Sequence, residues 1–181
     1  MKKILIGMLI ITGLSATSQS QIKTVTSIKD ETSMTYYLVH PLHKIESTSK
    51  DVASTIRIDA ANKTIQAVTA SVDVTTFDSG NSNRDSHAME VIDAISFPEA
   101  LFSSTHITAK NDSVFVTGQL TFHGITREVT MNALQQWSDK KLVIHAAMWI
   151  SLTGFQIERP SLLLVPVEDD LRFSLVTAYA L

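Results

Sequence analysis

Apolar and polar residues alternate along most of the chain from residue 34 onwards. In residues 64–76, Val68, Ala70, Val72 and Val74 fall on one face of an extended chain, with mostly polar residues between them. Successive side chains of a strand point to opposite faces of a sheet, so this period of two predicts strands with one buried face. The pattern recurs in 113–123, 126–136, 141–151 and 170–180 and more weakly in 51–59, and residues 34–40, 43–49 and 100–109 are further strand candidates.

Short polar turns separate several of these segments. Asn111-Asp112 precedes residues 113–123, Gly124 interrupts the chain before residues 126–136, and Asp139-Lys140 precedes residues 141–151. Turns of this length join antiparallel neighbours. The sequence therefore predicts about eight or more strands in an antiparallel arrangement.

Residues 83–95 are the stretch with helical spacing. Asn83 or Asp85 can cap the first turn, Met89 and Ile92 would face inward, and Pro98 stops the helix. Strands and helices do not alternate along the chain, which disfavours a doubly wound sheet. The pattern leaves a β-sandwich or a closed barrel with one short helix.

The first twenty residues follow a different pattern. Lys2 and Lys3 precede an apolar run at residues 4–14, and small residues follow as far as Ser20. This is the three-part pattern of a secretory signal, and its apolar run is shorter than the roughly 20 residues that span a bilayer. We expect cleavage of residues 1–20, with an uncleaved anchor as the alternative. Residues 21–181 would then form one periplasmic or secreted domain.

Composition removes several classes of function. The chain has 181 residues, of which 44% are hydrophobic, and it has 15 Lys and Arg against 18 Asp and Glu. Nucleic-acid binding needs clustered positive charge, so the balance disfavours it. The absence of cysteine excludes disulfides, thiolate metal sites and thiol nucleophiles.

Several segments, in order along the chain, resemble motifs of the YceI-like family. They are NRDSHAM at 83–89, Phe97-Pro98 followed by LFSS at 101–104, VTGQLTFHGITR at 116–127, and LTGFQI at 152–157. The resemblance covers residues 34–181. It implies an all-β, lipocalin-like antiparallel β-barrel. It also implies an apolar cavity that binds an isoprenoid or another long-chain amphipathic lipid in the periplasm, and often a homodimer.

The apolar strand faces supply the candidate lining of such a cavity. Alternate residues line the interior of a barrel, and each CH2 of a lipid tail gains about 0.8 kcal/mol on leaving water. Periodicity does not separate a hollow interior from a solid core, so a secreted interaction domain with a solid β-core is the alternative. The candidates are Val68, Ala70, Val72, Val74, Val116, Leu120, Phe122, Val129, Met131, Ile144, Met148, Phe155, Phe173 and Leu175.

Four residues are candidates for the head group or the cavity mouth: Arg84, His87, Met89 and Arg127. Arginine can bind a phosphate through two donors. The alternative is a structural role, in which Asp85 caps the helix and Arg84 or His87 bonds loop carbonyls.

Catalytic and metal chemistry have weaker support. There is no G-x-S-x-G elbow and no glycine-rich phosphate loop. A metal site would require histidines from separate segments to converge, the candidates being His40, His43, His106, His123 and His145. We expect a non-enzymatic protein without a metal or a stable membrane anchor, whose one bound group is a lipid. A secreted metalloprotein or hydrolase is the third alternative.

Overall fold

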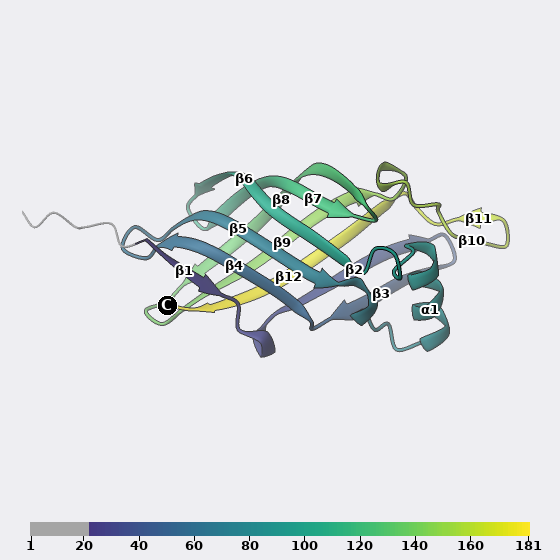
Figure 1. Ribbon diagram of the computed structural model, residues 1–181, viewed down its shortest axis with the longest axis horizontal. Helices are drawn as coiled ribbons and strands as arrows, with labels where there is room; N and C mark the ends of the chain where they lie inside the picture. Colours follow the sequence, from purple (N-terminus) through teal and green to yellow (C-terminus); the bar gives the residue numbers. More distant parts are fainter. Residues whose placement is uncertain (1–21) are drawn as a thin grey trace, which may run out of the picture.

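The computed structural model describes residues 22–181, so the expected signal at residues 1–20 lies outside the described residues. Ten strands form one antiparallel sheet in the order β1-β4-β5-β6-β7-β8-β9-β12-β2-β3. The sheet curls into an elongated barrel with helix α1 at one end (Figure 1). The predicted all-β, lipocalin-like barrel is confirmed, and its ten-stranded main sheet agrees with the expected eight or more strands.

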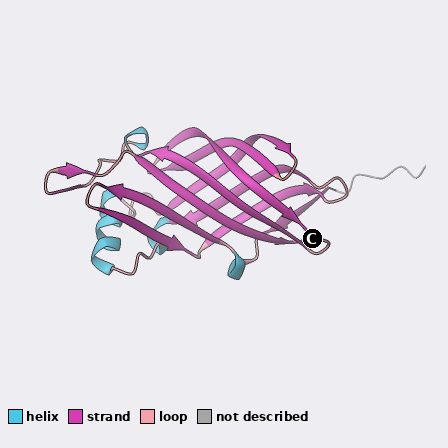
Figure 2. Cartoon of the chain, turned by 180° about the vertical axis from the view of Figure 1, so that it is seen from behind, coloured by secondary structure: helices cyan, strands magenta, loops and turns pink. Residues whose placement is uncertain are grey.

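The strands of the main sheet are β1 (Ile22–Thr26), β2 (Ser33–His40), β3 (His43–Ser49), β4 (Val52–Asp59), β5 (Thr64–Asp73), β6 (Glu99–Lys110), β7 (Ser113–Phe122), β8 (Ile125–Trp137), β9 (Lys141–Ser151) and β12 (Asp170–Ala180). Two short strands, β10 (Ser161–Leu162) and β11 (Val165–Pro166), pair only with each other. The helical elements are α1 (Ser82–Val91) and the 3-10 turns η1 (Lys29–Glu31), η2 (Val74–Thr76) and η3 (Thr153–Phe155). They lie at the ends and edges of the barrel (Figure 2).

Short bridges close the barrel in place of a continuous ladder. Ser27, just after β1, bridges to Tyr179 of β12, and Ile28 N–H donates to the Ala178 carbonyl at 2.8 Å. Elsewhere along the seam, Thr48 of β3 and Asp78 exchange two backbone hydrogen bonds of 3.0 and 3.1 Å. Strands β3 and β4 follow each other in the chain but do not pair. The seam of the barrel therefore lies between them.

The pairing between β8 and β9 is also incomplete, and we call this gap in the ladder the parting of β8 from β9. These strands pair only from Asn132 to Trp137 of β8, whereas β8 begins at Ile125. The turn η3 contacts both strands and covers this gap. The first half of β8 is thus paired with β7 as its one neighbouring strand, with η3 beside it.

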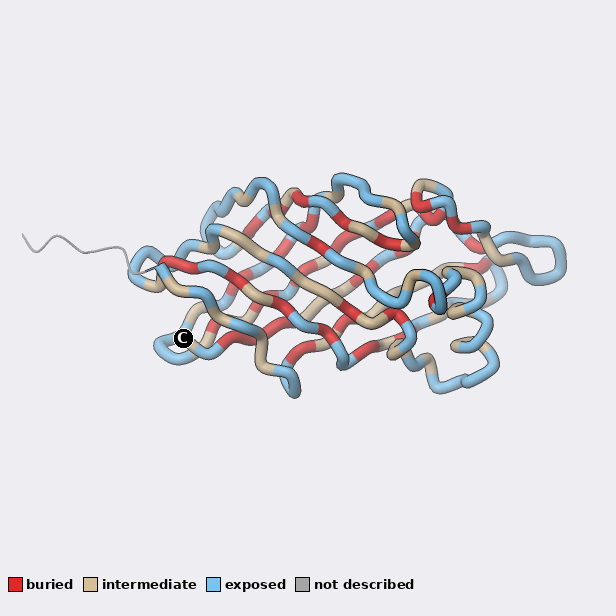
Figure 3. The backbone as a smooth tube through the Cα atoms, viewed as in Figure 1, coloured by how far each residue is buried: buried red, intermediate tan, exposed pale blue. Residues whose placement is uncertain are grey.

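The predicted inward faces are those that the structure buries. Buried and exposed residues alternate along β7 and β9, as Figure 3 shows for much of the barrel. The strand predicted for residues 64–76 ends at Asp73, because the Asp73 carboxylate accepts hydrogen bonds from Thr75 N and Oγ1 at 2.8 and 2.6 Å and starts η2.

Helix α1 begins earlier and ends earlier than predicted. Neither Asn83 nor Asp85 is the cap, since the Asn81 side chain accepts the hydrogen bond from Arg84 N at 3.1 Å. The helix ends at Val91, and Asp93 then adopts a positive φ of 45°, which turns the chain toward β6.

The end of the barrel away from α1 is a solid core. Ile56, Ile58, Leu142 and Tyr179 are at most 1% exposed there, and Val114 is 2% exposed. Tyr179 Oη donates to Ser54 Oγ at 2.7 Å, and Ser54 Oγ donates to the Thr69 carbonyl at 3.0 Å. This chain of hydrogen bonds ties β12 to β4 and β5 beneath the closing bridge.

We predict that Gly118→Ala destabilises the fold. A Cβ at Gly118 on β7 would lie 2.4 Å from the Ser103 carbonyl oxygen and 2.5 Å from the Phe102 ring. We expect a loss of about 1–3 kcal/mol, measured as a lower urea midpoint with an unchanged slope. Gln119→Ala, on the exposed face of the same strand, is the control and should change stability by less than about 0.5 kcal/mol. Equal midpoints for the two variants would contradict the close packing.

We also predict that stability falls at alkaline pH through Tyr179. Burial raises the pKa of its hydroxyl above the ordinary 10.0, with the Ser54 hydrogen bond opposing the shift. The unfolded chain loses this proton near pH 10, while the folded chain retains it to higher pH. The contribution is therefore fully present below pH 10 and is lost as the pH rises.

Urea midpoints between pH 8 and 11 would measure this loss. Tyr179→Phe should lower stability at pH 8 by about 1 kcal/mol, because Ser54 loses a partner. It should also flatten the alkaline decline. An identical decline in the variant would rule out Tyr179 as its source; Tyr36, whose pKa is also raised mainly by burial, contributes in the same direction.

Candidate binding cavity

A cavity of about 180 Å³ lies in the half of the barrel next to α1. Side chains from β2, β3, β5, β6, β7, β8, β9 and β12 form its wall, and α1 covers one side. The wall is almost entirely apolar, with Phe102, Phe122, Met131, Met148 and Phe173 among its largest side chains. One half of the barrel is thus solid and the other half is hollow.

Most of the predicted lining residues border this cavity. Because they share the inward face of their strands and lie toward the α1 end, they form one continuous surface. They are Val68, Ala70, Val72, Val74, Leu120, Phe122, Met131, Met148, Phe173 and Leu175.

Four other predicted lining residues do not border this cavity: Val116, Val129, Ile144 and Phe155. Val116 and Ile144 face inward but belong to the buried core of the solid half, and Val129 packs against that core while only partly buried. Phe155, on η3, is 2% exposed and packs against the Phe122 ring, with 5.8 Å between the ring centroids. A period of two identifies the face of a strand but not the position along the barrel.

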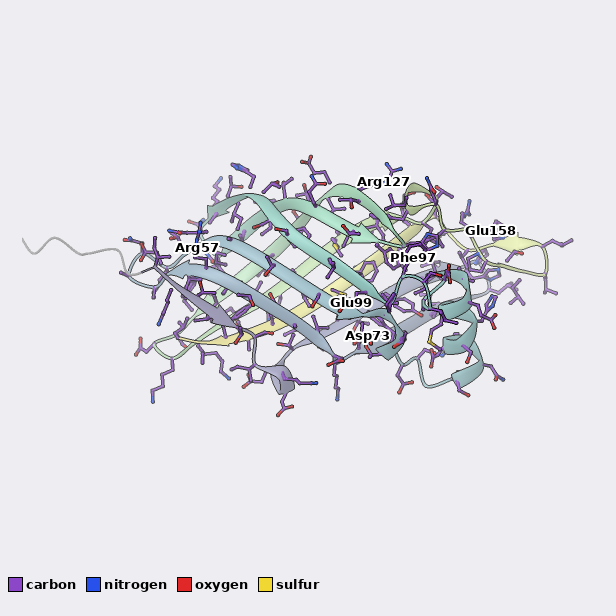
Figure 4. The ribbon with its side chains drawn as sticks, viewed as in Figure 1. Arg57, Asp73, Phe97, Glu99, Arg127 and Glu158 are labelled. Carbon is purple, nitrogen blue, oxygen red and sulfur yellow. The ribbon has the colours of Figure 1, made fainter. Side chains whose placement is uncertain are left out.

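Arg127, predicted at the mouth, is also outside the cavity. It pairs in register with Leu120, which faces inward, yet its side chain is exposed. At Arg127, labelled in Figure 4, β8 is not paired with β9, so no β9 strand flanks this residue.

Sequence reasoning missed several lining residues. Met34, Tyr36 and Leu38 alternate along β2, and Ile45 of β3 lies opposite Leu38, so the same periodicity could have identified them. Ile157 and Pro160 also line the cavity. They lie in an irregular segment between η3 and β10, where no periodic signal exists.

Helix α1 brings three of the predicted mouth residues to the cavity. Met89 and Arg84 border it from the helix, and His87 borders it with a side chain that is 64% exposed. His87 Nδ1 lies 3.6 Å from the Glu90 carboxylate, in an exposed pair on the helix surface. His87 is therefore a rim residue, whereas Met89 contributes to the apolar wall.

Arg84 and Asp85 hold the loop that precedes α1. Arg84 Nε donates to Ser79 Oγ at 2.8 Å, and Nη2 donates to the Ser79 carbonyl at 2.7 Å. The Asp85 carboxylate accepts from Ser79 N at 3.2 Å and from Ser79 Oγ. The structural role is thus present, with Arg84 bonding a loop carbonyl, although Asp85 binds Ser79 and does not cap the helix. Arg84 is also the only lysine or arginine of the cavity lining within residues 22–181.

A pair of hydroxyl groups forms a polar spot at the cavity. Tyr36 of β2 borders the cavity, and Ser47 of β3, its direct neighbour in register, is buried and does not itself line the cavity. Burial raises the pKa of Tyr36, and the nearby Ser47 hydroxyl opposes the shift. Within residues 22–181, buried Ser47 Oγ has no hydrogen-bond partner of normal geometry. The Tyr36 hydroxyl can accept or donate a hydrogen bond at the cavity wall, with the Ser47 hydroxyl beside it.

Asp169 fixes the turn that carries η3. Its carboxylate accepts from Ser151 Oγ, from Thr153 N at 2.9 Å and from Thr153 Oγ1 at 3.1 Å. The Ser151 hydrogen bond is the main cause that lowers the pKa of Asp169, and the Thr153 amide adds to it. The Asp169 carboxylate thus holds Ser151 and Thr153, the residues on either side of Leu152, which borders the cavity.

The candidate metal ligands do not meet. Across residues 22–181, no three His, Asp or Glu side chains come together as a metal site would require. His123 Nδ1 instead bonds the Phe155 carbonyl at 3.0 Å, and His40 Nε2 bonds the Val165 carbonyl at 3.0 Å. In the same part of the chain, no helix has the length and apolar character needed to cross a membrane.

Similar proteins agree with this architecture. Protein YceI of Salmonella arizonae is 30% identical over 118 residues, which are 61% of this chain and 62% of that protein, so the match spans less than two thirds of the relative. The crystal structure of BcnA from Burkholderia cenocepacia superimposes with a TM-score of 0.76 at 18% identity, over 84% of this chain and 98% of that one.

A polyisoprenoid binding domain from Saccharophagus degradans has a TM-score of 0.63 at 8% identity, over 88% of this chain and 99% of that one. At such identities the two solved structures establish the shared fold alone. The sequence itself matches the YceI-like domain over residues 17–178, which is most of its length. The resemblance noted in the motifs is thereby confirmed, and the chain belongs to the YceI family.

Proposed function

We propose that the protein binds one long-chain amphipathic lipid, an isoprenoid or a fatty-acid-like molecule, inside the hollow half of the barrel. The observation that carries this proposal is the cavity itself, whose wall is apolar on every strand that contributes to it. Support also comes from membership of the YceI family and from the polyisoprenoid binding domain that shares the fold.

The volume of the cavity bears on the length of the buried chain. A water molecule needs at least roughly 10–15 Å³ of such volume, so 180 Å³ accommodates on the order of 12–18 groups of that size. A methylene group is of similar size and gains about 0.8 kcal/mol on leaving water. Burial of a dozen such groups contributes roughly 10 kcal/mol before the entropic cost of binding. Apolar contact alone can therefore hold the tail.

The polar groups of the wall orient the ligand. Tyr36 and Arg84 border the cavity beside α1, with Ser47 next to Tyr36, while the opposite end is closed by the solid core. The head group would lie near α1 and the tail would point toward the core. A neutral hydroxyl or carbonyl head suits the Tyr36 and Ser47 hydroxyls, because Ser79 already engages two nitrogens of Arg84.

The competing functions have less support. A solid interaction domain would have no cavity, and a hydrolase would need a nucleophile beside a base. The carboxylate nearest the cavity, Asp85, is bonded to Ser79. The proposed mechanism is solvation of the lipid without catalysis, in the periplasm or outside the cell as the N-terminal pattern suggests. A homodimer remains part of the proposal.

Organic extraction of the purified protein followed by mass spectrometry tests the function. We expect a long-chain lipid at close to one molecule per chain. An empty extract, also after incubation with mixtures of isoprenoids and fatty acids, would contradict the proposal.

We predict that Ala100→Trp blocks ligand binding. Ala100 of β6 lies opposite Val72 of β5 and borders the cavity, so an indole there would occupy the space of the tail. We expect at least a tenfold loss of affinity for a fluorescent fatty acid, about 1.4 kcal/mol.

Gln119→Trp is the matched control. It adds the same side chain to the exposed face of β7 and should bind as the wild type does. Urea unfolding of both variants checks that the barrel persists, and Ala70→Leu offers a smaller obstruction of the same wall. Undiminished binding by Ala100→Trp would place the ligand elsewhere.

A further inference from the structure

A small apolar hairpin projects from the barrel at the end that holds α1 and the cavity. Residues 161–166 form it, with β10 and β11 paired to each other and to no strand of the barrel (Figure 1). All six residues are exposed, and Leu163 and Leu164 at the tip are 77% and 96% exposed. The barrel does not bury these leucines.

The turn chemistry also runs against leucine. Leu163 and Leu164 are the two central residues of the hairpin, and both have positive φ, of 53° and 65°. Such two-residue turns favour glycine, asparagine or aspartate, since a branched side chain is disfavoured in this conformation. Neither packing nor the turn conformation accounts for two leucines at the tip. We therefore look for their role in a contact with another molecule.

The base of the hairpin is fixed and is continuous with the cavity. Pro160 borders the cavity, and its carbonyl accepts a hydrogen bond from Val167 N at 2.9 Å. Arg159 Nε donates to the Val167 carbonyl at 2.8 Å, and Val167 is buried. A contact at the tip is thus rigidly connected to the wall of the cavity.

The neighbouring β2–β3 turn adds a further exposed leucine. Leu42 is 64% exposed, and the turn is held beside the hairpin by His40 Nε2, which donates to the Val165 carbonyl at 3.0 Å. Glu168 N also donates to the Val39 carbonyl at 2.8 Å. The apolar tip is defined here as Leu42 together with residues 162–165.

Charge and size indicate what covers the apolar tip. Residues 160–167 include no charged side chain. Their insertion into an apolar medium would therefore remove no charged group from water. The exposed acids Glu158 and Glu168 flank the hairpin, Glu158 near its base, which disfavours an anionic surface (Figure 4). Five residues are also far fewer than the 20–30 a side of a stable protein interface.

We propose that the apolar tip inserts into the surface of a lipid bilayer and brings the cavity mouth to it. The inference rests on the proposed function for the nature of the cargo, since a lipid that enters the cavity has to leave a membrane. Insertion is driven by the leucines and needs no anionic lipid.

Vesicle flotation with the purified protein tests this docking. Leu163→Asn/Leu164→Gly installs the residues that the turn prefers, so the fold should be retained. We expect about a tenfold or greater loss of partition onto phosphatidylcholine vesicles, with wild-type binding unchanged in 0.5 M NaCl. Leu134→Thr, which removes a leucine that is 54% exposed on the barrel wall, is the control and should bind as the wild type does. All variants share the same N-terminus, so the differences report on the hairpin.

A second readout locates the contact. Leu164→Trp should show a blue-shifted emission that brominated lipids quench, whereas Leu134→Trp should show neither change. Equal partition of wild type and the double variant would overturn the proposal, as would binding that requires anionic lipid or a dimer that the double variant dissolves. Lipid extraction from the double variant keeps the two proposals apart, because a filled cavity with lost docking overturns neither ligand binding nor the role of the tip.

Discussion

The closing contact between β1 and β12 is the constraint on which the rest of the structure depends. A curled sheet of ten strands has two edge strands, here β1 and β3. The barrel closes where Ser27, just after β1, bridges to Tyr179 in the part of β12 that extends beyond its pairing with β2, with the Tyr179–Ser54–Thr69 hydrogen bonds beneath it. Large apolar side chains fill the barrel around this contact. Because that end is fixed, the opposite walls of the barrel at the other end can stand apart without loss of the fold. The cavity occupies the space between these walls.

The periodicity of the sequence was sufficient to predict the strands and their buried faces, because one buried face dictates the alternation. It was not sufficient to locate the cavity. Val116 and Leu120 lie on the same face of β7, but only Leu120 borders the cavity. Whether a residue borders the cavity depends on the distance between opposite walls of the closed barrel. The local sequence pattern does not encode this distance.

Local polar chemistry was harder to assign. Asn81, Asn83 and Asp85 are all able to cap a helix, and the structure selects Asn81 because Asp85 is engaged by Ser79. Arg127 has the parity of an inward residue, but the strand that would enclose it turns away. The hairpin at residues 161–166 has neither alternation nor turn residues, so sequence rules for strands and turns gave no indication of it.

The parting of β8 from β9 gives the cavity wall unequal stiffness. Chain length is limited by the filled end, where a longer tail would have to displace a close-packed core. On the side where β8 and β9 part, the wall includes Leu152 and Ile157, which flank η3, a single turn held by the Asp169 carboxylate. A branched or doubled chain can be admitted by a shift of that turn, with every strand ladder left intact. For the lipid ligand proposed above, selection by chain length would therefore be stricter than selection by thickness.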